Sequence, residues 1–182
     1  MDAELVRLSR RLAWALRHDP TAAGLSLDAE GWAPVADVLD RLGLTRATLD
    51  AIVEGNDKRR FAISLGTDGV ARIRASQGHS VTVELGLSPV DPPAVLFHGT
   101  PAGNLASILA TGLDKRRRQH VHLSPDERTA HAVGSRRRTR PVVLRVDAAG
   151  MAAAGHLFYR SANGVWLTDH VPPAFLTPPD PR

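Results

Sequence analysis

Apolar residues recur at helical spacing near the start of the chain. Leucines fall three or four residues apart between Leu5 and Leu16, which predicts a helix over 2–18. Asp2 is placed to cap this helix and Asp19-Pro20 to end it. The other elements predicted for the first half are a strand at 24–27, a turn at 28–31, helices at 34–42 and 45–54, and a hairpin of strands at 61–65 and 70–75. A helix, a turn, two helices and then paired strands are the order of a winged-helix module.

The second half follows a proline-rich connector at 86–94, which is the predicted domain boundary. Its first predicted elements are a buried strand at 95–97 and a helix from Pro101, with Leu105, Ile108 and Leu109 inward and a left-handed Gly112 as its cap. Next come a helix from 124 to about 133, a strand at 142–146 and an alanine-rich turn or helix through 154. The last predicted strands, at 157–159 and 165–167, flank the hairpin signal Asn163-Gly164. The basic run at 136–140 is expected to be a solvated loop, and the proline-rich tail is expected to pack poorly.

Four consecutive cations, Lys115-Arg116-Arg117-Arg118, run into a short segment of period two. The alternation places His120 and His122 on one side and two apolar residues on the other. Next, Ser124-Pro125-Asp126-Glu127 matches a capping box with proline at the first helical position, so a helix is expected to start at Ser124. Guanidinium and imidazole groups beside a helix N-terminus suit a ligand with phosphates and aromatic rings. A basic loop followed by an edge strand is the alternative interpretation.

Composition restricts the classes of protein that remain. The chain has 182 residues, 43% of them hydrophobic, which is enough for one domain or two small ones with a real core. It has no cysteine, which excludes disulfides and thiolate zinc sites, and neither a long apolar run nor a signal-peptide pattern, so a cytoplasmic protein outside the membrane is expected. The net charge of +4 comes with an excess of arginine, which favours nucleic acid or phosphorylated ligands. Aromatic residues, at 4%, are too few for a single-strand binder with many stacking platforms.

Seven short segments carry a more specific signal. They are Leu16-Arg17-His18-Asp19-Pro20, Gly24-Leu25-Ser26-Leu27-Asp28 with Gly31-Trp32, Asp57-Lys58-Arg59-Arg60-Phe61, Ile73-Arg74-Ala75-Ser76-Gln77-Gly78-His79-Ser80, His98-Gly99-Thr100, Arg118-Gln119-His120-Val121-His122-Leu123-Ser124, and Ser161-Ala162-Asn163-Gly164-Val165-Trp166-Leu167-Thr168. In this order, and over nearly the whole chain, they resemble the NAD-dependent RNA 2′-phosphotransferases, which remove the splice-junction 2′-phosphate in tRNA splicing. The one departure is Ser76, where asparagine is commoner in the family.

The resemblance implies an α+β fold with two lobes. A winged-helix lobe over 1–88 would bind the RNA phosphate, an ADP-ribosyltransferase-like lobe over 92–182 would bind NAD, and the active site would lie in the cleft between them. The implied reaction has two steps. The RNA 2′-phosphate first attacks C1″ of NAD and releases nicotinamide; the ribose O2″ then attacks phosphorus, which frees 2′-OH RNA and ADP-ribose 1″,2″-cyclic phosphate. No metal is implied, and a monomer is expected.

The resemblance also assigns roles to residues by motif. The catalytic set of the family falls on Arg17, His18, Arg60 and Arg118. NAD binding is implied for His98, Gly99, Thr100, His120 and His122, with His122 favoured as the residue that stacks on nicotinamide. Binding of the RNA phosphate is implied for Arg17, Arg60, Gln77, His79, Ser80 and Arg118. The physical account agrees, because guanidinium groups placed beforehand stabilise the charge that builds up on phosphate oxygens, and an imidazole exchanges protons near neutral pH.

Two other functions stay open from the sequence. The first is a non-catalytic winged-helix protein that binds nucleic acid, but its predicted recognition helix at 45–54 carries only Arg46 outward, which argues against reading of the major groove. The second is an enzyme that stops after ADP-ribosylation of terminal nucleic-acid phosphates. Protein-modifying relatives use a glutamate that has no counterpart at 163–166, and a carboxylate there would repel a phosphate nucleophile.

Overall fold

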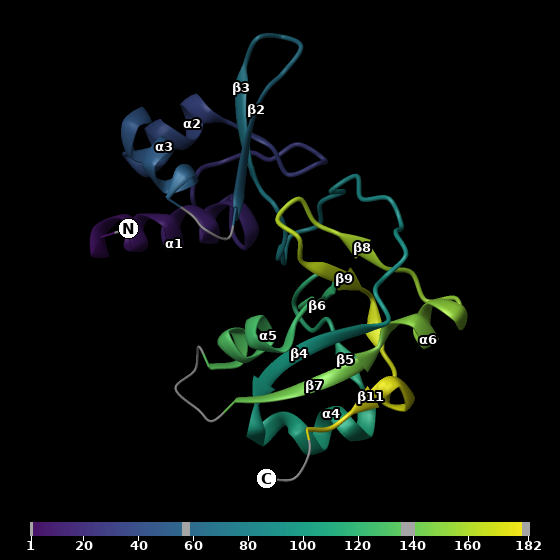
Figure 1. Cartoon of the computed structure of the whole chain (residues 1–182). Coiled ribbons are helices and arrows are strands. Elements are labelled where there is room, and N and C mark those ends of the chain that lie inside the picture. The colour runs from purple at the N-terminus through teal and green to yellow at the C-terminus, as the bar shows by residue number, and fades with distance from the viewer. Residues whose placement is uncertain (1, 56–58, 136–140, 180–182) are drawn as a thin grey trace. The chain divides into compact units, whose positions relative to one another are not determined.

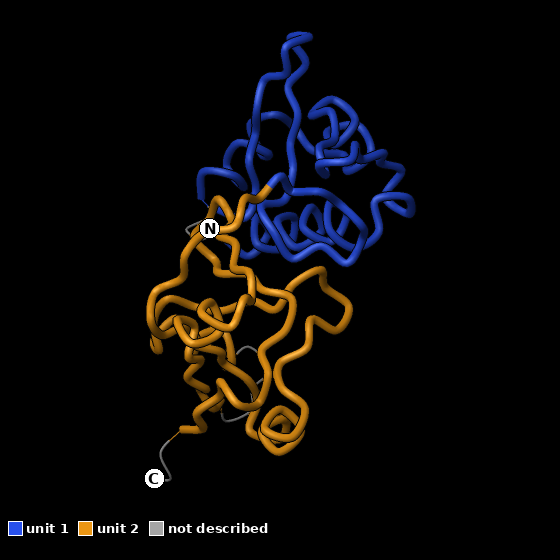
Figure 2. Tube along the Cα trace, turned by 90° about the vertical axis from the view of Figure 1, so that its right-hand side faces the viewer, with its two compact units in different colours: residues 1–86 blue, residues 87–182 orange. Residues whose placement is uncertain are grey.

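A computed structural model describes residues 2–55, 59–135 and 141–179. The chain divides into two compact units, Met1–Gly86 and Leu87–Arg182, coloured blue and orange in Figure 2. Both units mix helices and strands. The expected lobes at 1–88 and 92–182, with their winged-helix and ADP-ribosyltransferase character, stay predictions. Across the described ranges, no helix combines the length and the apolar character that crossing a membrane requires.

The helices and strands of both units are labelled in Figure 1. The described part of unit 1 has, in chain order, α1 (Ala3–Arg17), β1 (Ala33–Pro34), α2 (Val35–Leu42), α3 (Arg46–Glu54), β2 (Phe61–Leu65) and β3 (Ala71–Ala75). The described part of unit 2 has β4 (Val95–Pro101), η1 (Ala102–Asn104), α4 (Leu105–Thr111), β5 (Leu113–Asp114), β6 (Val121–Leu123), α5 (Glu127–Gly134), β7 (Pro141–Asp147), α6 (Ala148–Ala153), β8 (Tyr159–Arg160), β9 (Trp166–Thr168), β10 (His170–Val171), η3 (Pro173–Phe175) and β11 (Leu176–Thr177).

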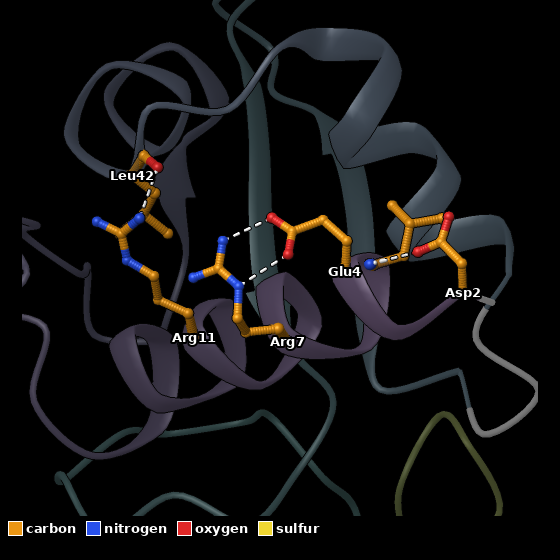
Figure 3. Close-up of polar contacts among 6 residues, drawn as sticks. Asp2, Glu4, Arg7, Arg11 and Leu42 are labelled. Atoms are coloured by element: carbon orange, nitrogen blue, oxygen red, sulfur yellow. Dashed lines mark hydrogen bonds and ion pairs between the residues drawn. The ribbon is translucent and has the colours of Figure 1, made fainter.

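Helix α1 begins and ends where the sequence predicts. The Asp2 side chain caps it by accepting a 2.8 Å hydrogen bond from the Leu5 amide (Figure 3). Its apolar stripe buries Leu12 completely against α3 and the three-stranded sheet β1-β3-β2. In the middle of the helix, Arg11 Nη1 donates a 3.0 Å bond to the Leu42 carbonyl at the end of α2 (Figure 3). At its end, the Arg17 carbonyl accepts a 2.9 Å bond from the Ser80 amide, so the last turn has a defined position in the unit.

The predicted hairpin and turn of unit 1 are confirmed, but one predicted strand is wrong. Strands β2 and β3 pair antiparallel over their full lengths, and the Gly31 amide closes the turn by donating to the Asp28 carbonyl at 3.0 Å. Residues 24–27 form no strand. Strand β3 already has β1 and β2 as its two neighbours, and Leu25 is buried by side-chain packing instead of strand pairing. An alternating apolar pattern predicts that one face is buried, but it does not distinguish burial in a paired strand from burial by side-chain packing alone.

Unit 2 is built around the pairing of β4 with β7. The two strands are antiparallel over seven residue pairs, from Val95↔Asp147 to Pro101↔Pro141, and β11 continues the sheet on the far side of β7. A second sheet has the order β6-β9-β8, and β5 pairs with β10. Phe97 of β4 forms an isolated bridge with Ser124, directly after β6. This bridge holds the end of β6 against β4, and both strands carry candidate site residues.

The structure corrects three predictions in unit 2. Helix α5 is capped by Asp126, which accepts from the Thr129 amide at 2.7 Å, because Ser124 exchanges two backbone hydrogen bonds with Phe97 and belongs to the strand. Gly112 ends α4 with φ 87° and ψ −176°, which is a positive φ but not the left-handed helical conformation. The proline-rich tail packs as far as β11, where Leu176 contacts the core.

The remaining predictions for unit 2 are mostly confirmed. Asn163-Gly164 lies in a hairpin between β8 and β9, closed by the Ser161 amide donating to the Val165 carbonyl at 3.0 Å. Helix α4 buries Ile108, but Leu109, predicted to point inward, is 36% exposed. The basic run at 136–140 lies outside the described residues.

Candidate active site

In unit 1, four of the predicted site residues meet at the end of α1. The His18 ring is hydrogen-bonded through Nδ1 to the Ser80 hydroxyl at 3.0 Å, and the Ser80 amide donates to the Arg17 carbonyl at 2.9 Å. Arg17 Nη2 donates to the Arg60 carbonyl at 3.4 Å. Cations are favoured at the C-terminus of a helix, so α1 supports this cluster through its dipole as well as through its position.

The segment before Ser80 is attached to Arg60 by backbone pairing. The Ser76 amide donates to the Arg60 carbonyl at 2.9 Å, and the Ser76 hydroxyl donates to the Arg59 carbonyl at 2.8 Å. Ser76 is buried, while Gln77 is half-buried. The residue that departs from the family pattern therefore stabilises the backbone next to Arg60.

His79 is placed differently from the other predicted phosphate ligands. Its side chain is 1% exposed, and neither ring nitrogen has a hydrogen-bond partner among the described residues. Burial, reinforced by the positive charges of Arg17, Arg74 and His18, lowers the pKa of His79 to about 4. At neutral pH the ring is therefore uncharged, and it serves as an interior support of the segment that carries Ser80.

Unit 2 contains a cavity of about 850 Å³. It is lined by His98, Gly99, Thr100, Pro101, Asn104, Ser107, Ile108, Thr111, Gly112, Leu113, Asp114, Lys115, Arg116, Arg117, Arg118, His120, Val121, His122, Val133 and Gly134. All five residues predicted to bind NAD are in this lining, together with Arg118. Asp114 is the single carboxylate among the lining residues, so the cavity strongly favours an anionic ligand.

His98 enters the cavity with a defined proton position. Its Nδ1 lies 3.1 Å from the His122 carbonyl oxygen, which can only accept, so Nδ1 carries the proton and Nε2 is left as an acceptor. Burial, and then the charges of Arg118 and Arg116, lower the pKa of His98 below its ordinary value, although the hydrogen bond opposes them. A neutral imidazole with a free lone pair suits a hydroxyl donor such as that of a ribose.

Arg118 and His122 form a second defined pair in the cavity. Arg118 Nη1 donates to His122 Nδ1 at 2.6 Å, and because a guanidinium only donates, the proton of a neutral His122 is on Nε2. This short hydrogen bond fixes the His122 ring relative to the Arg118 guanidinium group. His120 is stabilised on another side, where its ring centroid lies 5.6 Å from that of Tyr159; burial lowers its pKa, against the opposing effect of Asp169.

Gly99 and Thr100 have roles in packing that the sequence does not disclose. A Cβ on Gly99 would lie 1.7 Å from the Ala130 carbonyl oxygen, so glycine is required for α5 to approach β4 this closely. Thr100 is 4% exposed, and its hydroxyl accepts a 3.2 Å hydrogen bond from Asn104. Both residues therefore hold helices against the strand that forms one wall of the cavity.

Several lining residues were not among the predicted site residues. The sequence indicates Lys115, Arg116 and Arg117 only as a cationic run without individual roles, and it gives no signal for Asn104. Arg116 has a positive φ of 52°, which is uncommon for a residue other than glycine. The turn closes through the Arg118 amide donating to the Lys115 carbonyl at 3.0 Å. The cationic run was the available signal, and the structure shows that all four of its cations line the cavity.

Within the described residues, no group of three or more histidine, aspartate or glutamate side chains has a metal-binding arrangement.

Comparisons with known proteins identify the class of protein. A family model described as "RNA 2'-phosphotransferase, Tpt1 / KptA family" matches residues 3–170. The chain is similar to a "Probable RNA 2'-phosphotransferase" of Streptomyces griseus subsp. griseus, with 51% identity over 180 residues that cover 94% of this chain and 95% of the relative. Proteins of the same name are 50% identical over 182 residues in Hahella chejuensis (97% and 96% covered) and 52% identical over 174 residues in Agrobacterium fabrum (93% and 91% covered). The chain belongs to the RNA 2'-phosphotransferase family, a family of transferases.

The family assignment confirms the resemblance found in the sequence motifs. The individual roles of the site residues stay predictions, as does the expectation that the two lobes share one active site. What the structure adds is local: one cluster around Arg17, His18, Arg60 and Ser80, and one cavity that contains His98 and Arg118.

Proposed function

We propose that this chain transfers an internal RNA 2′-phosphate to NAD in two steps. The 2′-phosphate first becomes ADP-ribosylated with release of nicotinamide, and the products of the second step are 2′-OH RNA and ADP-ribose 1″,2″-cyclic phosphate. The observation that carries the proposal is the family match over residues 3–170, which includes all twelve residues predicted to form the site. The absence of cysteine supports a cytoplasmic location.

The cavity of unit 2 fits NAD as a ligand. Its volume of about 850 Å³ is within the range of small-molecule sites, and its cations suit a pyrophosphate. Nε2 of His98 would accept from a ribose hydroxyl, and His122 would stack on nicotinamide while Arg118 holds its ring. When bound, NAD supplies the ribose carbon that accepts the phosphate and a hydroxyl for the second step.

The chain contributes electrostatic stabilisation to the transfer. Negative charge concentrates on the non-bridging oxygens of the phosphate, and the guanidinium groups of Arg17, Arg60 and Arg118 would stabilise it. A 2′-phosphate is already a nucleophile and needs no carboxylate base. His18, hydrogen-bonded to Ser80, would donate or accept a proton at the phosphate.

Two alternatives are distinguishable from this proposal. An enzyme that ADP-ribosylates terminal phosphates would use the same cavity and the same arginines but would stop after the first step. A non-catalytic nucleic-acid binder would not need His98 and Arg118, each hydrogen-bonded to His122, in one cavity, and the family match favours the enzyme.

The test is incubation of the protein with NAD and a short RNA that carries one internal 2′-phosphate, with separation of the products by mass. We expect 2′-OH RNA and the cyclic phosphate of ADP-ribose in equal amounts. The matched control is the same RNA with its phosphate at the 5′ end. Release of nicotinamide without conversion of the internal phosphate would contradict the proposal, and so would no turnover of either RNA.

Substitutions test the assigned arginines. Arg60→Ala and Arg118→Ala are expected to slow the reaction about 10²–10³-fold and to let ADP-ribosylated RNA accumulate, because each removes a donor to the phosphate oxygens. Arg59→Ala is the matched control, since Arg59 is the exposed neighbour of Arg60 and has no assigned role. His98→Ala should instead raise the KM for NAD. Complete conversion by Arg60→Ala at the wild-type rate would refute its assignment.

A further inference from the structure

Unit 1 contains an arginine–tryptophan stack that none of the roles above uses. The guanidinium carbon of Arg74 lies 4.5 Å from the centroid of the Trp32 ring, which is the geometry of a cation–π contact. Trp32 is half-buried, and about a fifth of the Arg74 side chain is exposed (21%). A planar group and an aromatic ring therefore lie together at the surface of the unit.

Both members of the stack are held in place. The Asp28 side chain accepts a 2.9 Å hydrogen bond from the Trp32 amide, and Glu30 Oε2 accepts from the Trp32 indole nitrogen at 3.3 Å. Arg74 Nη1 donates to the Glu30 carbonyl at 3.3 Å. The platform is preorganised by these bonds, so a ligand that stacks on it loses little additional conformational entropy in the protein.

The stack is adjacent to the predicted phosphate cluster. A Cβ on Gly31, the residue before Trp32, would lie 3.5 Å from Nε2 of His79. The stack and the end of α1 therefore lie around one buried ring, because the charges of Arg17, Arg74 and His18 all act on the His79 imidazole that Gly31 adjoins. Two adjacent nucleotides of one RNA strand would place one at Arg17 and His18 and the other at Trp32.

The charge of the stack favours a base over a phosphate. The Glu30 carboxylate is 62% exposed and lies 3.8 Å from Arg74 Nη1, so it offsets the arginine charge and would repel a phosphate. Stacking on arginine planes and aromatic rings is the usual way in which proteins hold unpaired RNA bases. A flat, uncharged heterocycle is therefore the group that this surface fits.

We propose that the Trp32–Arg74 stack binds the base of a nucleotide at or next to the one that carries the 2′-phosphate. This inference rests on the proposed function, which it deepens by assigning a substrate-recognition site. A single stack also agrees with the low aromatic content, because one platform serves one base.

The first experiment leaves the protein unchanged. Three RNAs with an internal 2′-phosphate are compared with the parent RNA, each lacking one base: that of the phosphorylated nucleotide, of its 5′ neighbour or of its 3′ neighbour. We expect one of the three to raise the KM for RNA by about tenfold to one hundredfold, with a smaller change in kcat, because stacking on an aromatic side chain contributes at this level. Equal KM values for all four RNAs would overturn the proposal.

The second experiment assigns the effect to the stack. Trp32→Ala and Arg74→Lys should each raise the KM for the parent RNA but leave the KM for the sensitive abasic RNA unchanged, since the partner of the stack is already missing there. Trp32→Phe, which retains a ring, should restore part of the affinity. Trp14→Ala is the matched control, because Trp14 is 43% exposed in the same unit and should behave as wild type.

The outcomes separate this inference from the proposed function. If the wild-type protein fails to convert any internal 2′-phosphate, the proposed function fails first. If it converts the parent RNA but Trp32→Ala raises the KM of parent and abasic RNAs equally, or raises only the KM for NAD, then the stack does not bind an RNA base.

Discussion

The buried histidine of unit 1 gives a pH dependence of stability that is measurable directly. His79 is 1% exposed and has no hydrogen-bond partner among the described residues. Burial lowers its pKa from 6.5 to about 4, and the nearby charges of Arg17, Arg74 and His18 add to the effect. The folded chain therefore excludes a proton that the unfolded chain binds once the pH falls below 6.5.

The sign and the size of the effect follow from this difference. Above pH 6.5 both states hold a neutral ring, and the contribution of His79 to stability is fully present. As the pH falls toward 4, the unfolded state gains a proton that the folded state lacks, and stability is lost. The loss attributable to His79 should reach about 2 kcal/mol at about pH 5.

The assay is urea unfolding at about pH 7.5 and about pH 5, compared between the wild type and His79→Met, which fills a similar volume and cannot titrate. The Trp14 and Trp32 fluorescence reports on unit 1, and a Trp166→Phe background removes the signal of unit 2. The wild type should lose about 2 kcal/mol more than the variant between the two pH values.

The comparison concerns the difference between two pH values, so any packing defect of His79→Met cancels. If both proteins lose the same free energy of unfolding on acidification, the imidazole of His79 is not held neutral in the interior, and the reasoning from its burial is refuted. A larger loss in the variant would point to the opposite sign.

Two further predictions concern unit 2. In urea unfolding, Gly99→Ala should lower the free energy of unfolding by about 3 kcal/mol or more, because its Cβ would overlap the Ala130 carbonyl oxygen. The control Gly103→Ala should be nearly neutral, because nothing lies within 4 Å of its new Cβ. Asp126→Ala should lower the Tm by removing the cap of α5, and Ser124→Ala should not; the reverse order in thermal unfolding followed by circular dichroism would return the cap to Ser124.

Much of the local structure was determined by the sequence. The N-terminal helix follows from the leucine spacing and its first residue from the Asp2 cap. Its end at Arg17 follows from Asp19-Pro20. The hairpin of β2 and β3 follows from alternation, and the two strands pair from Phe61↔Ala75 to Leu65↔Ala71. These features depend on residues within a few positions of one another, so the sequence contains all the information that they require.

The sequence motifs also selected the correct family, but not the physical state of each site residue. His79 was assigned with the solvent-facing ligands, and only its surroundings show that it is buried. Gly99 was assigned to ligand contact, and only the position of α5 shows that its missing side chain is needed for packing. Burial and close approach depend on segments tens of residues away, which no local pattern encodes.

The same contrast holds for Ser124 and for the imidazoles of the cavity. Four consecutive residues favoured Ser124 as a helix cap, but pairing with Phe97 engaged its backbone first, and the helix began three residues later. Alternation placed His120 and His122 on one side, but the proton positions of His98 and His122 depend on which partner each nitrogen meets. Hydrogen bonds between distant segments compete with local preferences, and only the folded chain decides which of them form.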